Sequence, residues 1–464
     1  MISLLLALVI VQPASAQEET EAPATEGASD EAPAAPEAEE APAAPEAEEA
    51  PAAPEAEEAP AAPEAEEAPA APEAEEAKKE AWEKKGWGWG GLPFVVYSSD
   101  DGVNVGLIGS IYKYDGETAP YKTRIGWLAS FTSKGILYEY IDVDAVGLAG
   151  GKLRLTTRLL FDSRFSEPFC GIGGDVQCDD DTAYDQMDEL GVPEADQEDS
   201  LTRWYQAAYR MPYGLVWARY ELAEKPHAVE LIGSYRLSYL SPWDKFDHTY
   251  YGEGWDADDE KGFTSVLQAG IMADNRDNEP SPFRGYWVEA TVRGASKFWG
   301  SKYDYFGFNT TLRGYLPILS EGRLTLADRF VFDGIVGDAN MKELDWLGGY
   351  QMYTGLGGAR SLRGVRANRY RGKVKILNQA ELRWRFVRWK PGSTVVDFYL
   401  QAFLDAGQVA AEWEDLGDSP IQLGEGLGLR IAFNQNFILR GDFATSASEG
   451  WGLSGLYLDV DNLW

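Results

Sequence analysis

The sequence has 464 residues and a formal net charge of −35, which argues against a nucleic-acid partner because the phosphates of such a partner would be repelled. No run of 18 or more uninterrupted apolar residues follows residue 16, so a helical membrane protein is excluded. With 49 Gly, 16 Trp and 24 Tyr and many alternating segments, the remaining classes are a large soluble β-protein and an outer-membrane β-barrel.

The first segment, residues 1–16, reads MISLLLALVIVQPASA. Its apolar run is too short to span a bilayer, and it ends in the small-residue pattern Ala14-Ser15-Ala16, which is typical of a signal-peptide cleavage site. We therefore expect residues 1–16 to be a removable export signal, although the basic residues that usually precede the apolar run are missing.

The next segment, residues 17–85, contains five tandem copies of APAAPEAEE at residues 32–76. The repeat has no aromatic or branched aliphatic residue, so it cannot bury a core, and we predict a disordered periplasmic linker. Residues 17–77 hold 20 Glu and one Asp without Lys or Arg, so most of the net charge lies here. At roughly 3.1 Å per residue, the extended segment would reach about 200 Å. A solvated spacer and a tether to the cell wall or to a periplasmic protein both remain open.

From Gly86 onward, every second side chain is apolar in segments of ten or more residues. The clearest is 373–389, which is longer than a typical strand of a soluble sheet. Its apolar face holds Val374, Ile376, Ala380, Leu382, Trp384 and Phe386, and its polar face holds Lys373, Lys375, Gln379, Glu381, Arg383 and Arg385. A soluble sandwich would bury the apolar face, whereas a membrane barrel would turn it to lipid and enclose the charges. Strand length and the aromatic residues near the strand ends favour the barrel.

Sixteen such segments can be counted, and an even number is usual for a bacterial outer-membrane barrel. They are 92–99, 103–114, 121–133, 136–148, 152–164, 202–222, 227–241, 263–275, 286–296, 304–317, 323–336, 373–389, 394–409, 422–434, 437–447 and 452–464. The longest connections, 165–201, 242–262 and 337–372, all follow odd-numbered strands, so they lie at one end. The sequence therefore predicts an all-β fold, with a 16-stranded antiparallel transmembrane β-barrel at residues 86–464.

The sequence has two cysteines, Cys170 and Cys178, in the first long connection. In an exported chain a local disulfide is the default interpretation, ahead of a metal pair or free thiols. His227 and His248 have no neighbouring residues spaced as in a catalytic triad or a metal site, so we expect no enzyme activity, metal or cofactor. A solvated loop is preferred over a Ca²⁺ site for the acidic residues of the second long connection, Asp256, Asp258, Asp259 and Glu260.

Two motifs give a more specific indication. The third long connection contains GLGGARSLRGVR at 355–366, and the segment 394–409 contains FLDAG at 403–407. Here the chain resembles the BamA/TamA-type outer-membrane assembly barrels, also called the bacterial surface antigen family. That family has a sixteen-stranded barrel whose sixth outer loop folds a (V/I)RG(F/Y) motif back into the lumen against an FxDxG motif on the wall. The resemblance assigns the first motif to Leu362, Arg363, Gly364 and Val365, and the second to Phe403, Asp405 and Gly407.

The strand alternation agrees with this pairing. If Leu400 and Leu404 face lipid, then Gln401 and Asp405 face the lumen. A guanidinium on a returning loop could form a bidentate pair with that carboxylate and fix the position of the loop. We therefore predict an ion pair between Arg363 and Asp405.

A third element resembles the family's DxRDNxxxPxRGxxxE signature around the periplasmic turn between the eighth and ninth strands. Its fixed positions are Asp274, Arg276, Asp277, Asn278, Pro282, Arg284, Gly285 and Glu289. Pro282 and Gly285 are expected to shape the turn, while Asp277 and Arg284 can satisfy the turn backbone and each other. We assign this motif a structural role.

The sequence departs from the family upstream of the barrel, where substrate-capturing members carry POTRA domains and this chain has only the linker and a Trp/Gly-rich hinge at 82–91. The resemblance implies insertion or translocation of protein or lipid at a Gram-negative-type outer membrane, through a weak seam between short or interrupted first and last strands. The alternative is a passive pore or structural barrel with a periplasm-spanning tether. Expected partners are outer-membrane lipid and lipopolysaccharide, with periplasmic proteins or cell wall contacted through the tail.

Overall fold

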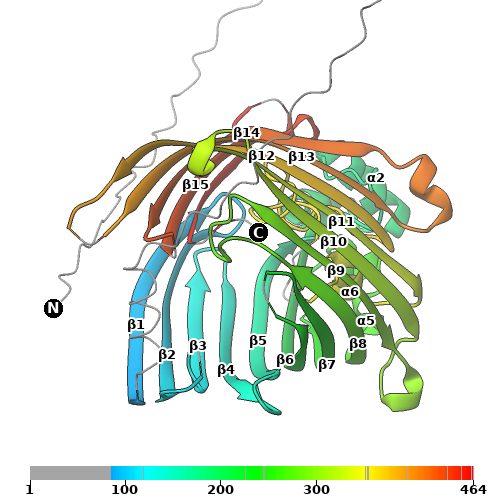
Figure 1. The fold of residues 1–464 in the computed structure, drawn as a ribbon. Helices are drawn as coiled ribbons and strands as arrows, with labels where there is room; N and C mark the ends of the chain where they lie inside the picture. Colours follow the sequence, from blue (N-terminus) through cyan, green and yellow to red (C-terminus); the bar gives the residue numbers. More distant parts are fainter. Residues whose placement is uncertain are drawn as a thin grey trace, which may run out of the picture. The chain divides into compact units, whose positions relative to one another are not determined.

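The structure of the protein, a computed structural model, describes residues 85–462 except 119, 225, 244, 245, 351, 353, 354, 393, 436, 451 and 461. The predicted signal peptide and nearly all of the predicted linker therefore lie outside the described residues. In the part that is described, sixteen antiparallel strands close into a barrel in which neighbours follow chain order, as predicted (Figure 1). No helix of these residues has the length and apolar composition needed to cross a membrane.

The strand bounds are β1 (Lys85–Ser98), β2 (Gly102–Asp115), β3 (Thr123–Thr132), β4 (Ile136–Leu148), β5 (Leu153–Pro168), β6 (Gln206–Ala223), β7 (Ala228–Pro242), β8 (Gly262–Asp274), β9 (Gly285–Ala295), β10 (Tyr305–Pro317), β11 (Leu324–Gly337), β12 (Val374–Trp389), β13 (Val396–Ala410), β14 (Ile421–Phe433), β15 (Phe437–Thr445) and β16 (Gly455–Val460). The α-helices are α2 (Asp180–Leu190), α3 (Glu194–Leu201), α4 (Tyr250–Glu253), α5 (Ala257–Glu260) and α6 (Met341–Asp345). The 3-10 helices are η1 (Lys297–Trp299), η2 (Ser320–Gly322), η3 (Glu414–Gly417) and η4 (Ala447–Glu449). Each predicted segment overlaps one strand.

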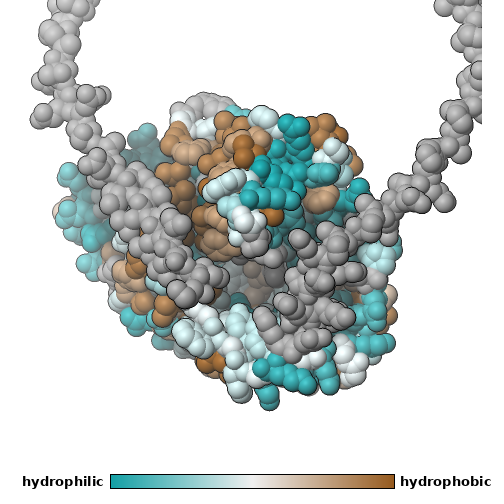
Figure 2. All heavy atoms as spheres, turned by 60° about the vertical axis from the view of Figure 1, so that its left-hand side comes forward, coloured by the Kyte–Doolittle hydropathy of each residue, from teal (hydrophilic) through white to brown (hydrophobic). Residues whose placement is uncertain are grey.

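The strands have the two faces that the alternation predicts. In β13, Leu400 and Leu404 are 42% and 48% exposed on the outside, whereas Gln401 and Asp405 face the lumen and are fully buried. Hydrophobic side chains are visible on the side of the barrel that Figure 2 brings forward. Because apolar groups face outward and charged groups are enclosed, the wall is built to meet lipid, as in a membrane barrel and unlike a sandwich.

The two ends of the barrel differ. We call one the loop end, because it carries the three long connections, 169–205 with α2 and α3, 243–261 with α4 and α5, and 338–373 with α6. The other is the turn end, with short connections such as 275–284 and 318–323. The predicted disulfide between Cys170 and Cys178 is present in the first long connection, with the Cα atoms 5.6 Å apart.

The first strand differs most from the prediction. β1 begins at Lys85 instead of residue 92 and pairs with β2 along its whole length, so the predicted hinge is wrong in its described part and Pro93 lies inside the strand. Trp87 and Trp89 are 70% and 83% exposed, and the positions on either side of them are glycines. Glycine carries no polar side chain to mark the second face, so the alternation was hidden. Only β16, with six residues, is short as expected.

Candidate functional site: a plug loop and a weakly paired seam

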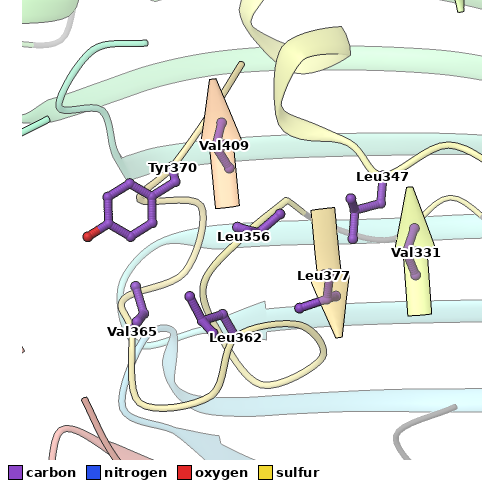
Figure 3. Close-up of a cluster of buried hydrophobic side chains, with 8 residues drawn as sticks. All are labelled: Val331, Leu347, Leu356, Leu362, Val365, Tyr370, Leu377 and Val409. Atoms are coloured by element: carbon purple, nitrogen blue, oxygen red, sulfur yellow. The ribbon is translucent and has the colours of Figure 1, made fainter. Parts of the chain in front are cut away.

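The connection 338–373, here called the plug loop, folds back into the barrel. Its side chains Leu356, Leu362 and Val365 lie against the inner wall (Figure 3). The whole buried cluster comprises Leu347, Leu356, Leu362, Val365 and Tyr370 of the plug loop with Val331 of β11, Leu377 of β12 and Val409 of β13. At roughly 1.5–3 kcal/mol for each fully buried large side chain, this cluster alone favours the folded-back loop strongly.

Two glycines of the predicted motifs allow the loop to approach the wall. Gly364 has a φ of +90°, and a Cβ there would lie 2.6 Å from the carbonyl oxygen of Thr445 at the end of β15. A Cβ on Gly407 of β13 would lie 2.3 Å from the side chain of Leu356. Any other residue would strain the backbone or displace the loop, so both positions serve close packing.

Arg363 forms the predicted pair with Asp405. Its Nε lies 2.7 Å from Asp405 Oδ2 and its Nη2 lies 2.9 Å from Asp405 Oδ1, so the contact is bidentate. The backbone N–H of Arg363 also donates to Asp405 Oδ2 at 3.1 Å. Both side chains are fully buried, and this geometry fixes the loop in one position on the wall.

Three further contacts of Arg363 were not predicted. Its Nη1 lies 2.9 Å from Oε1 of Glu381 on β12 and 3.3 Å from Oδ2 of Asp442 on β15. Its guanidinium carbon lies 3.5 Å from the centre of the Phe403 ring, a cation–π contact that gives the motif phenylalanine its place. Glu381 was placed on the luminal face by the alternation, but its partner depends on where the loop returns.

The charges around Arg363 compensate one another. The network joins the arginines Arg363, Arg383, Arg430 and Arg440 to the carboxylates Glu381, Asp405, Asp442 and Asp459. Burial alone would lower the pKa of Arg363, but the carboxylates, Asp405 foremost, outweigh it and raise that pKa, so the group stays charged. Buried pairs of this kind are poor sources of net stability, yet loss of one partner leaves an uncompensated charge. The network therefore positions the loop.

The third motif, the DxRDNxxxPxRGxxxE signature, shapes the turn between β8 and β9. Arg276 donates from Nε and Nη2 to the two oxygens of Asp274 at 2.9 and 3.0 Å. Asp277 Oδ1 accepts from the backbone N–H groups of Phe283 and Arg284, both at 3.1 Å. The remaining motif positions of the turn are Asn278, Pro282 and Gly285. Asn278 Oδ1 accepts from Ser281 N at 2.8 Å, and Gly285 has a φ of +104°. Asp277 thus meets Arg284 through the backbone.

Glu289, the last position of that motif, has a different place. It lies on β9, is 2% exposed and accepts from the backbone N–H of Tyr350 at 3.1 and 3.2 Å. Tyr350 belongs to the plug loop, so Glu289 holds the loop and does not belong to the turn. Sequence reasoning missed this contact because it joins residues 61 positions apart.

The seam between the first and last strands is weakly paired. Among the described residues, the ladder between β1 and β16 has two residue pairs, Tyr97 with Leu458 and Ser98 with Tyr457. β1 pairs with β2 over 14 rows and β13 with β14 over 13. The β16 side of β1 from Lys85 to Val96 therefore has no ladder among these residues, and unpaired backbone groups are costly in contact with lipid.

The other candidate residues lie away from this site. Glu260 is 6% exposed, and its oxygens accept from Trp255 Nε1 at 2.8 Å and Met341 N at 3.0 Å, so the expectation of a solvated acidic stretch is wrong there. His248 Nδ1 lies 2.9 Å from Glu253 Oε1, and His227 Nδ1 lies 3.5 Å from the hydroxyl of Tyr286. In the described residues, no group of three or more His, Cys, Asp or Glu side chains is arranged to hold a metal ion.

Most of the barrel matches a known protein family. A model of the Omp85 superfamily domain matches residues 161–453, which include the plug loop, the motif at 403–407 and the turn motif at 274–289. The chain belongs to the Omp85 superfamily. Omp85 barrels of this kind sit in bacterial outer membranes, in agreement with the two-faced wall. A search of curated proteins found no match.

Two solved structures have a similar fold at low sequence identity. BamA from Haemophilus ducreyi lacking POTRA domains 1–3 is 12% identical with a TM-score of 0.50, and the match covers 82% of this chain and 69% of that one. CdiB from Escherichia coli is 10% identical with a TM-score of 0.51, and the match covers 81% of this chain and 61% of that one. This chain thus spans under two thirds of the CdiB chain, and the likeness concerns the barrel fold.

Proposed function

We propose that this Omp85 barrel takes part in insertion or translocation of protein or lipid at the outer membrane, with the seam as its working part. The observation that carries the proposal is the two-row ladder between β1 and β16 beside a plug loop fixed by Arg363. A wall that can part at one place offers the unpaired backbone of β1 to an incoming chain and disturbs the adjacent bilayer. The plug loop would keep the lumen closed while the seam acts.

We further propose that the loop end faces the cell exterior, next to lipopolysaccharide, and that the N-terminal tail lies in the periplasm. β1 starts at the turn end, because its last residues adjoin the plug loop at the loop end through Asp100 and Ala367. With the loop end outside, the residues before Lys85 enter from the periplasmic side. The tail would then contact cell wall or a periplasmic protein.

One observation favours a second candidate, a passive pore. On β3 and β5 the luminal arginines Arg124, Arg154 and Arg158 have side chains that are 25%, 36% and 26% exposed, while Arg363 and Asp405 are fully buried. The plug loop thus does not cover the luminal face of these two strands. A water-filled path along them would conduct ions.

Planar-bilayer conductance of the full chain distinguishes the two. A plugged assembly barrel should conduct little, and Arg363→Ala should raise its conductance severalfold because the loop is released from Asp405 and Glu381. The ion pair of Lys373 with the exposed Glu412 provides a matched control, since Glu412→Ala removes an ion pair at the loop end without touching Arg363. High conductance in the unmodified protein, unchanged by Arg363→Ala, would favour the passive pore.

A second experiment tests the cellular role directly. Depletion of the protein should lower the amount of at least one outer-membrane protein or lipid class if the barrel inserts or moves such molecules. Restoration by the unmodified chain but not by Arg363→Ala would connect the defect to the plug loop. A depleted strain with normal outer-membrane protein and lipid content would contradict the proposal.

A further inference from the structure

The tip of the plug loop, residues 366–369, lies at the rim of the seam and contacts the hairpin of β15 and β16. Glu449 in η4, the turn between these strands, has a side chain that is only 5% exposed. It accepts from the backbone N–H of Arg366 at 3.2 Å and from Arg369 Nη1 at 2.6 Å, and it lies 3.1 Å from Arg366 Nε. The tip is therefore tied to one side of the seam by two cations and one backbone donor.

The same tip also reaches the other side of the seam. Asp100, in the turn between β1 and β2, accepts from the backbone N–H of Ala367 at 3.1 Å. Neighbouring loop residues thus contact the last hairpin and the first hairpin at once. These contacts lie beside the rows that close the wall, where Ser99 N donates to Leu456 O at 2.9 Å.

The two sides are held unequally. The plug loop reaches β16 itself twice more, through Arg360 Nη2 and Asp459 Oδ2 at 2.9 Å and through Gly364 N and the hydroxyl of Tyr457 at 3.2 Å. On the β1 side, the tip is held by the hydrogen bond from Ala367 N to Asp100 Oδ1. A cavity of about 220 Å³, bordered by both the loop tip and the seam strands, leaves the tip room to move.

We propose that the loop tip is a clasp that holds β1 to the last hairpin at the loop end, and that the seam opens when the bond between Ala367 and Asp100 breaks. Among the described residues the ladder of the seam has two rows, so a contact that bridges its ends is a large part of what keeps these rows closed. Because the loop stays bound to β16 and to Asp405, β1 is the strand that moves. This inference rests on the proposed function, in which an opening seam is the working part.

The clasp can be tested by cross-linking across the seam in the full chain, embedded in lipid vesicles. The pair Tyr97→Cys and Leu458→Cys replaces residues that face each other in the ladder, and the native cysteines are already bonded to each other. A short bifunctional thiol reagent then reports the closed seam. In this background, Asp100→Ala should lower the rate of cross-linking at least threefold.

Two matched variants separate the clasp from general damage. Asp100→Asn keeps a side-chain oxygen that can accept from Ala367 and carries no charge, so it should cross-link at least as fast as the parent, whereas Glu412→Ala at the loop end should cross-link at the parental rate. Cold and heated samples compared by electrophoretic mobility show whether each variant is a folded barrel. Equal rates for Asp100→Ala and its parent would overturn the clasp, as would an equal loss in Asp100→Asn. Slower cross-linking with unchanged client insertion would support the clasp and count against the proposed function alone.

Discussion

The wall beneath the plug loop and the wall at the seam consist of the same two-faced strands, but they are held together differently. From β12 to β15 neighbouring strands pair over 9 to 15 rows, and Glu381, Asp405 and Asp442 bind Arg363 from three different strands. At the seam, the described residues of β1 and β16 share two rows, and the tip of the plug loop contacts Asp100 in the turn after β1. The loop is thus anchored on the continuous wall, so the seam can part without the loop leaving the lumen.

Removal of Arg363 should give the largest loss of unfolding free energy, because this side chain anchors the plug loop on the wall. Arg363→Ala leaves three carboxylates buried without their shared cation, which costs about 3–5 kcal/mol of unfolding free energy. The measurement is the urea midpoint of the refolded barrel. Arg366→Ala is the control in the same loop, since its side chain is 59% exposed and its loss should cost about 1 kcal/mol or less. Equal losses would mean that the buried network does not anchor the loop.

A methyl group added at Gly364, also in the anchored part of the plug loop, should cause a smaller loss of unfolding free energy. The residue has a φ of +90° and no room for a Cβ beside Thr445, so Gly364→Ala should cost about 1–3 kcal/mol. The control is Gly314→Ala on β10, where a Cβ would meet nothing within 4 Å. If thermal unfolding of the two variants were indistinguishable, the close approach of the loop to β15 would not matter for stability.

The smallest effect concerns pH at the seam. Burial raises the pKa of Asp100 to about 7, and Asp101 and Glu449 add to this, while the hydrogen bond from Ala367 and the charge of Lys134 lower it. When the clasp opens, the carboxyl regains its ordinary pKa near 3.8. A folded-state pKa above the open-state value means that the clasp is favoured at low pH and weakens as pH rises toward 7.

Brief conductance openings should therefore become more frequent between pH 5 and pH 7 and level off above pH 8. The change should amount to a few-fold, since Asp100 is only partly shielded from water. Asp100→Asn cannot titrate and should show a flat profile over the same range. A persistent rise in that variant would assign the pH dependence to another group.

Much of the barrel could be predicted because the signal is local. In β12 and β13 most residues indicate their face by being apolar or polar, with luminal exceptions such as Leu377 and Phe403, and counting such segments gives the sixteen strands. Prediction of the ion pair between Arg363 and Asp405 required two further observations. These were the resemblance to a family and the strand alternation that places Asp405 in the lumen. The first residues of β1 were not predicted as strand, because glycine lies between the tryptophans and provides no side chain that would identify the second face.

By itself, the sequence determined the number of strands, most of the residues that form them and which face is apolar, and its resemblance to a family indicated the long connection whose arginine returns to the wall. Only the tertiary structure decided that Glu381 and Asp442 share this arginine, that Glu289 holds Tyr350, and that the tip of the plug loop bridges the seam. The physical reason is the distance along the chain between the residues involved. The alternation of apolar and polar residues concerns close neighbours in the sequence. These tertiary contacts join distant residues, and they form only after the strands close into the barrel and fix how far β1 and β16 overlap.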